Sequence, residues 1–122
     1  MQLERAATGS WGVVVWAVDA SGKAPAYNDF HDLDDKDAAK MQALFNRLAA
    51  DGFIANDEKF KKLCNRDGHA RWELKSFQLR FLGTFTKNRQ FLVALGLKKK
   101  SRTHRSRDLD RAARILSEHL SR

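Results

Sequence analysis

Residues 69–97, "HARWELKSFQLRFLGTFTKNRQFLVALGL", carry a pattern that indicates three β-strands. They divide into three runs, 69–77, 78–86 and 89–97, that are rich in aromatic and aliphatic residues and are separated by short polar connections. Such runs are typical of β-strands. Asn88, in the connection at 87–88, tolerates a positive φ and so favours a hairpin. Three consecutive strands with short connections predict an antiparallel meander.

Apolar and charged residues alternate along residues 70–75, "ARWELK". Because successive side chains of a strand point to opposite faces, this alternation predicts one buried and one charged face of the sheet. Arg80 joins the charged face if the meander register places it beside Lys75. Glu73 is then a cross-strand partner that neutralises a neighbouring cation.

The segments before and after the meander complete the pattern. "WGVVVWAV", residues 11–18, favours a strand, and Gly22 and Pro25 mark a turn region after it. Residues 29–52 carry apolar side chains at helical spacing and end at Gly52, which favours a helix. "DEKFKKLCNRDG", residues 57–68, is expected to be helical or irregular. Residues 106–122 carry an apolar face at helical spacing and predict a second long helix.

These elements predict one domain over residues 1–122 in the α+β class. We expect a small antiparallel sheet, made of the N-terminal strand and the three-stranded meander, with helices packed on it. The expected order is strand, helix, short helix, three strands, helix.

The net charge of +8 is unevenly distributed along the chain. Residues 1–58 carry 5 Lys/Arg and 10 Asp/Glu, whereas residues 59–107 carry 15 Lys/Arg and 2 Asp/Glu, a net of +13. Residues 108–122 are balanced, with 3 of each. Such a concentrated basic block favours a polyanionic partner such as nucleic acid.

The sequence lacks the motifs of several common kinds of catalytic or cofactor site. A phosphate-binding glycine loop and a G-x-S-x-G serine are both missing, so we expect no nucleotide cofactor. The four histidines show no metal-ligand spacing with the single cysteine, Cys64, so we expect no metal site. One cysteine is typical of a reducing compartment, and the apolar run at 11–18 is too short to span a membrane. We therefore expect a cytoplasmic protein.

A cationic set on and after the strands is the remaining candidate for chemistry. RNA supplies its own nucleophile, the 2′-OH, so its cleavage needs positioning, charge stabilisation and proton transfer. A lysine crowded by other cations has a lowered pKa and can exchange protons near neutral pH. The set consists of Arg71, Lys75, Arg80, Lys98, Lys99, Lys100 and Arg102.

The order of these segments resembles the RelE/HigB family of bacterial toxins, in particular its phage and HigB-like branch. The resemblance rests on "RWELK" at 71–75, "LRF" at 79–81 and "ALGLKKKSR" at 94–102, followed by the amphipathic "DLDRAARIL". It implies a RelE-like fold and a ribosome-dependent endoribonuclease that cuts mRNA in the A site without a metal or other cofactor. It also implies a bacterial host and a cognate antitoxin, often a helix-turn-helix protein.

The resemblance also implies roles for individual residues. Lys75 and Arg80 would grip the scissile phosphate, and Lys99 would transfer a proton or stabilise the transition state. The surrounding RNA-binding residues would be Arg71, Lys98, Lys100, Arg102 and His104. The family's usual tyrosine is missing from "LRFLGTF", and Leu95 stands where a histidine is frequent. His69 or His104 are the candidates to replace these groups.

Two other classes of function remain open from the sequence. One is a RelE/ParE-like protein that binds or inhibits a host target such as gyrase without catalysis. The other is a basic nucleic-acid-binding protein, for which association would be sensitive to salt and independent of sequence.

Overall fold

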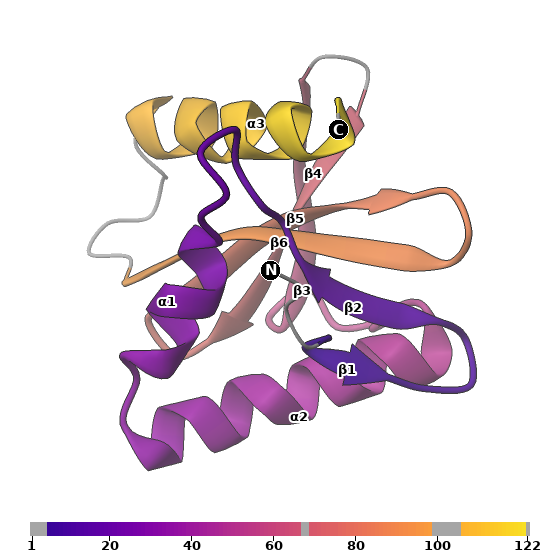
Figure 1. Ribbon diagram of the computed structural model, residues 1–122. Helices are drawn as coiled ribbons and strands as arrows, with labels where there is room; N and C mark the ends of the chain where they lie inside the picture. The colour runs from indigo at the N-terminus through magenta and orange to yellow at the C-terminus, as the bar shows by residue number, and fades with distance from the viewer. Residues whose placement is uncertain (1–4, 67–68, 99–105, 122) are drawn as a thin grey trace.

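The protein folds as a six-stranded mixed sheet with helices on both faces (Figure 1), which confirms the α+β class. The computed structural model describes residues 5–66, 69–98 and 106–121. The elements are β1 (Ala7–Thr8), β2 (Val13–Trp16), α1 (Pro25–His31), α2 (Asp35–Asp51), β3 (Phe60–Arg66), β4 (His69–Ser76), β5 (Leu79–Thr86), β6 (Gln90–Lys98) and α3 (Ser106–Leu120).

The meander predicted from residues 69–97 is confirmed. Strands β4, β5 and β6 pair in sequence as antiparallel neighbours, and the full strand order is β1-β2-β6-β5-β4-β3. Asn88, in the β5–β6 connection, has a φ of 70° as expected, and its neighbour Arg89 has a φ of 56°. The expectation of a purely antiparallel sheet is wrong, because β2 pairs with β6 in parallel. A pairing between segments so far apart in the chain leaves no local sequence signal.

Three elements differ from the sequence prediction. Residues 60–66 form β3, which pairs antiparallel with β4, rather than a short helix. The short helix lies earlier, at α1, where Pro25 occupies the first turn instead of marking only a turn region. A two-residue strand, β1, precedes β2. The observed order is therefore strand, strand, helix, helix, four strands, helix.

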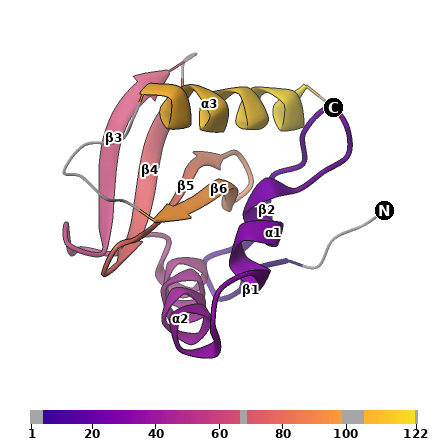
Figure 2. The same ribbon diagram turned by 90° about the vertical axis from the view of Figure 1, so that its left-hand side faces the viewer.

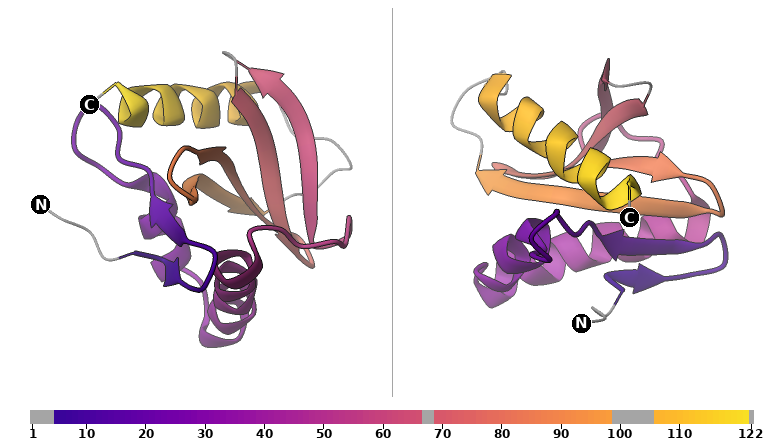
Figure 3. Two further views of the ribbon diagram at one scale, coloured as in Figure 1. Left: turned by 90° about the vertical axis from the view of Figure 1, so that its right-hand side faces the viewer. Right: turned by 45° about the horizontal axis from the view of Figure 1, so that its top comes forward.

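The sheet separates two hydrophobic cores. Helices α1 and α2 cover one face, where Phe45 packs against Trp16 and Phe81. Helix α3 covers the other face through Ala112, Ile115 and Leu116. Figure 2 shows α3 and α2 on opposite sides of the twisted sheet, and the two views in Figure 3 agree. The meander is thus held between two helical layers.

Helix ends are fixed by side chains that the sequence supplies. The carboxylate of Asp34 accepts a hydrogen bond from the Asp37 N–H (2.8 Å) and caps α2, which ends at Gly52 with a φ of 76°. At the C-terminal end of α3, His119 Nδ1 accepts from the Val18 N–H (2.9 Å) and Glu118 accepts from the Ala20 N–H (2.9 Å). These bonds join α3 to the segment that follows β2.

Candidate nucleic-acid interface

Three of the residues expected to handle a phosphate lie at one end of the sheet. Lys75 and Arg80 are direct cross-strand partners in β4 and β5, as the register prediction required. Arg80 in turn pairs with Leu97 of β6, next to Lys98. Lys99, Lys100, Arg102 and His104 lie outside the described residues. The end of the meander therefore brings Lys75 and Arg80 together, and β6 ends there at Lys98.

Arg80 is largely engaged inside the protein. Its guanidinium donates hydrogen bonds to the carbonyl oxygens of Phe77 (2.5 Å) and Leu79 (2.8 Å), and its Nε lies 3.8 Å from the Glu73 carboxylate. The Arg80 side chain is 16% exposed, and that of Glu73 is 3% exposed. Arg80 thus fixes the β4–β5 hairpin beside Lys75 and presents little of its charge to solvent.

The charged face predicted for β4 is largely covered. Arg71 and Glu73 are each 2% exposed, and Arg71 pairs across the sheet with Cys64. Lys75, at the end of the same face, is half-buried and is the most accessible of the three. Trp72 and Leu74 lie on the opposite face, in the core beneath α2, as the alternation predicts.

Lys98 lies on the face opposite to Arg80. Its cross-strand partner is Leu79, whose side chain belongs to the core under α1 and α2, and opposed residues share a face. Lys98 lines a cavity of about 200 Å³ beside Asp29 and Asp32 of the α1 region. Lys98 therefore stands beside the α1 region, on the other side of the sheet end from Lys75.

Asp29 of α1 binds the backbone of β6 beyond Val93, where the pairing with β2 ends. Its carboxylate accepts a hydrogen bond from the Gly96 N–H (2.9 Å). Burial raises the pKa of Asp29 above the ordinary aspartate value, against the opposing effects of the Gly96 bond and the Arg111 charge. Asp32 acts in the same direction as burial.

Asp29→Asn should therefore change how stability depends on pH. The amide oxygen of asparagine still accepts the Gly96 bond but has no charge to bury. A raised pKa means that the folded state holds the proton more tightly, so the Asp29 contribution to stability falls as pH rises through and above the ordinary aspartate range. Denaturant unfolding at a series of pH values should show that the free energy of unfolding of the variant rises relative to that of the wild type as pH increases across that range. A stability difference that is constant with pH would contradict this assignment.

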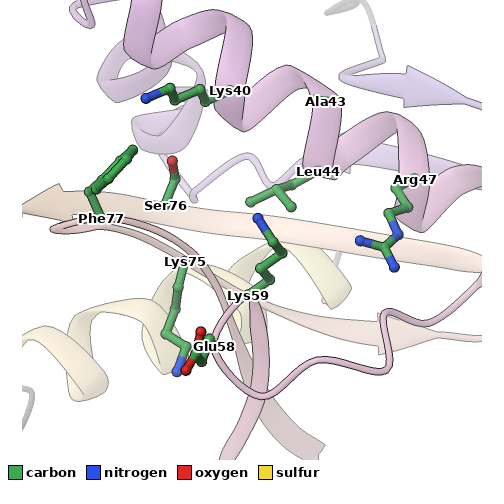
Figure 4. A pocket seen from close by; sticks show the side chains of 9 residues that line it. All are labelled: Lys40, Ala43, Leu44, Arg47, Glu58, Lys59, Lys75, Ser76 and Phe77. Atoms are coloured by element: carbon green, nitrogen blue, oxygen red, sulfur yellow. The ribbon is translucent and has the colours of Figure 1, made fainter.

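A basic cleft of about 540 Å³ lies between α2 and the β4–β5 hairpin. Figure 4 shows its cations on three separate segments, with Lys40 and Arg47 on α2, Lys59 before β3 and Lys75 at the end of β4. Glu58 is the one acidic residue among those lining it, and Ala43 and Leu44 add apolar surface. We name this feature the α2–hairpin cleft.

Phe77, at the edge of the α2–hairpin cleft, combines an unfavourable backbone conformation with an exposed side chain. It has a φ of 55°, and its side chain is 78% exposed. A left-handed backbone costs a non-glycine residue about 1–2 kcal/mol, and an exposed ring regains little of this by burial. Lys40 Nζ lies 4.0 Å from the ring centroid, a contact worth about 0.5–1 kcal/mol at an exposed site. Local energetics therefore do not account for the aromatic ring at this position.

The sequence did not reveal this cleft. Lys40 and Arg47 lie in the acidic N-terminal half of the chain, outside the basic block at 59–107, so the charge distribution does not indicate them. Their spacing of seven residues, two helical turns, is the signal that places both on one face of α2.

The described residues were also compared with the requirements of a membrane span and of a metal site. Among the described helices, none has the length and apolar composition to cross a bilayer. Within residues 5–66, 69–98 and 106–121, no group of three or more His, Cys, Asp or Glu is placed to hold a metal ion.

No family model matches this chain, and no curated protein matches it at a significant level.

Proposed function

We propose that this protein is a toxin-like, ribosome-dependent endoribonuclease that cuts mRNA without a metal and is neutralised by a cognate antitoxin. The observation that supports this most directly is the cross-strand pairing of Lys75 with Arg80 beside the strand that leads into Lys99. The RelE-like resemblance of the same segments and the basic block at 59–107 point in the same direction.

The reaction would use the nucleophile that RNA carries. The 2′-oxygen forms a bond to phosphorus while the bond from phosphorus to the 5′-oxygen breaks, leaving a cyclic phosphate and a 5′-hydroxyl end. The 2′-OH gives up its proton, and the departing 5′-oxygen takes one. In this scheme Lys75 holds the phosphate and Lys99 transfers a proton or stabilises the charge of the transition state.

Arg80 has a more restricted part in this scheme than the family resemblance implies. Its bonds to the carbonyls of Phe77 and Leu79 hold the hairpin that carries Lys75. Both bonds come from Nη1, and with only 16% of the side chain exposed Arg80 offers little surface to a phosphate. We therefore assign the direct phosphate contact to Lys75 and regard Arg80 chiefly as a positioning residue.

The internal engagement of Arg80 also favours a second candidate, a RelE-like protein that binds without cutting. A binder of nucleic acid needs the accessible cations of the α2–hairpin cleft but no second group on the scissile phosphate. Inhibition of a host protein such as gyrase belongs to the same non-catalytic class.

Induced expression in a bacterial host separates these candidates. We expect growth to stop and new 5′ ends to form in translated mRNA, with plasmid supercoiling unchanged. Lys75→Gln should lower the yield of these ends by about a hundredfold, because it removes a cation that stabilises the transition state. Lys87→Gln removes the same charge from the β5–β6 connection, where Lys87 is exposed, and should leave cleavage intact.

Three results would contradict the proposal. Growth arrest with altered supercoiling and intact mRNA would assign the chain to the gyrase-inhibiting class. Salt-sensitive RNA association with no toxicity would assign it to the plain binders. Equal cleavage by Lys75→Gln and the wild type would remove Lys75 from the site.

A further inference from the structure

The β4–β5 hairpin places an aromatic side chain where its backbone disfavours one. Ser76 and Leu79 are the last cross-strand pair, so Phe77 and Gln78 form a two-residue loop. In such loops a positive φ at the first position is typically taken by glycine. Here the position holds Phe77, with a φ of 55° and 78% exposure. An observed backbone outlier of this kind is grounds for a functional hypothesis.

The ring is accessible on the side away from Lys40. The Lys40 ammonium lies over one face of Phe77, 4.0 Å from its centroid. Because most of the residue is nevertheless exposed, the other face remains open to a flat ligand. Figure 4 shows Phe77 extending from the hairpin on the same side as Ser76 and toward α2.

The charges next to the ring suit a chain of phosphates. Lys40 and Arg47 come from α2, and Lys59 comes from the segment opposite to it, so the cations are spread along the cleft and are not gathered at one point. The volume of about 540 Å³ lies within the range of ligand sites, about 300–1,000 Å³. A basic groove beside an exposed aromatic ring is the usual arrangement for binding a single strand of nucleic acid.

We propose that the α2–hairpin cleft binds a single-stranded RNA segment, with one base stacked on Phe77 and neighbouring phosphates on Lys40, Arg47 and Lys59. This inference rests on the proposed function: Lys75 lines the cleft at its β4 side and extends away from α2 (Figure 4), so it would hold the cut phosphate where the RNA leaves the cleft. An acidic peptide would use the cations but has no need of the open ring. A duplex keeps its bases stacked inside and offers none to Phe77.

Binding is measured by fluorescence anisotropy with a short single-stranded oligoribonucleotide whose 2′-hydroxyls are methylated. Such a probe cannot be cut through its 2′-oxygen, so binding is separated from cleavage. We expect Phe77→Gly to weaken binding at least about fivefold, because one stacked base is lost. Phe77→Trp, which keeps a ring at the same backbone position, should bind as tightly as the wild type or more tightly.

The contribution of the cleft cations to RNA binding is tested by two double variants that remove the same charges from different places. Lys40→Gln with Arg47→Gln should weaken binding and reduce the slope of log affinity against log salt by about 1 to 2. Lys87→Gln with Arg114→Gln removes the same two kinds of charge from exposed positions outside the cleft, and should weaken binding much less. If both double variants lose the same affinity, the cleft is not a specific site, and binding depends only on the overall positive charge of the protein.

The thermal midpoint of Phe77→Gly distinguishes loss of contact from loss of folding. Glycine relieves the strained φ, so the variant should unfold at the same temperature as the wild type or higher. Unchanged binding by this variant would overturn the stacking assignment. Equal competition by duplex RNA, or by an acidic peptide, would overturn the single-stranded RNA assignment.

The two proposals fail separately. If cleft variants lose the methylated probe while the wild type cuts no mRNA in cells, the cleft stands and the endoribonuclease does not. If the wild type cuts mRNA and cleft variants bind the probe normally, the cleft assignment alone is overturned.

Discussion

Glu73→Gln should lower the free energy of unfolding by about 3 kcal/mol or more. The Glu73 side chain is 3% exposed, and its carboxylate lies 3.8 Å from Arg80 Nε. Removing the Glu73 charge leaves the mostly buried Arg80 guanidinium with its two carbonyl bonds but without this carboxylate, and loss of one partner of a buried pair is among the most damaging single changes. Glutamine keeps the size of the side chain, so the effect isolates the charge. Denaturant unfolding monitored by tryptophan fluorescence measures it.

The chain offers a matched control in a second ion pair with the same separation. Arg114 Nε lies 3.8 Å from the Glu118 carboxylate, but the Arg114 side chain is 68% exposed. Arg114→Ala should therefore cost less than about 0.5 kcal/mol. If Glu73→Gln costs no more than Arg114→Ala, the Glu73–Arg80 pair does not hold the hairpin, and Arg80 is available to a phosphate.

Gly83→Ala should destabilise the protein by about 3 kcal/mol and disturb the meander. Gly83 lies in the middle of β5, at the register shift between Leu82 and Gly83. A Cβ there would overlap the backbone carbonyl oxygen of Leu92 and would lie 2.7 Å from the ring of Phe91. Because the obstructing atom belongs to the backbone of the paired strand, the strands must move apart.

Gly22→Ala serves as the comparison for this change. Gly22 has a φ of 84°, but a Cβ there meets no atom within 4 Å. Its substitution should cost about 1 kcal/mol through backbone strain alone. Equal midpoints in urea for the two variants would contradict the close approach of β5 and β6.

The meander was predictable from the sequence because its information is local. Alternation in residues 70–75 fixes which side chains face the core, and Asn88 permits the positive φ of the β5–β6 turn. The long helices α2 and α3 carry complete apolar faces, and Gly52 ends the first of them. Each of these signals lies within a few residues of the structure that it specifies.

The remaining elements depend on contacts between distant segments. Strand β3 is an edge strand with exposed Lys61 and Lys62, and a register shift after Lys62 breaks its alternation. Helix α1 has seven residues, too few to show a period, and packs its aromatic side chains against Trp16. The parallel pairing of β2 with β6 depends on the whole fold.

The same distinction between local and long-range contacts applies to the candidate site. Lys75 and Arg80 were identifiable because one hairpin pairs them. The α2–hairpin cleft was not, because its cations come from three segments that only tertiary structure brings together. The internal bonds of Arg80 likewise depend on the hairpin geometry, which its sequence position does not specify.

Endoribonuclease activity is best tested by a map of RNA 5′ ends in bacterial cells after induction. We expect new 5′-hydroxyl ends within the coding regions of translated mRNAs, present with the wild type and with Lys87→Gln, and lost with Lys75→Gln. An unchanged map in cells that express the folded protein would contradict it, as would a map in which Lys75→Gln produces the same ends as the wild type.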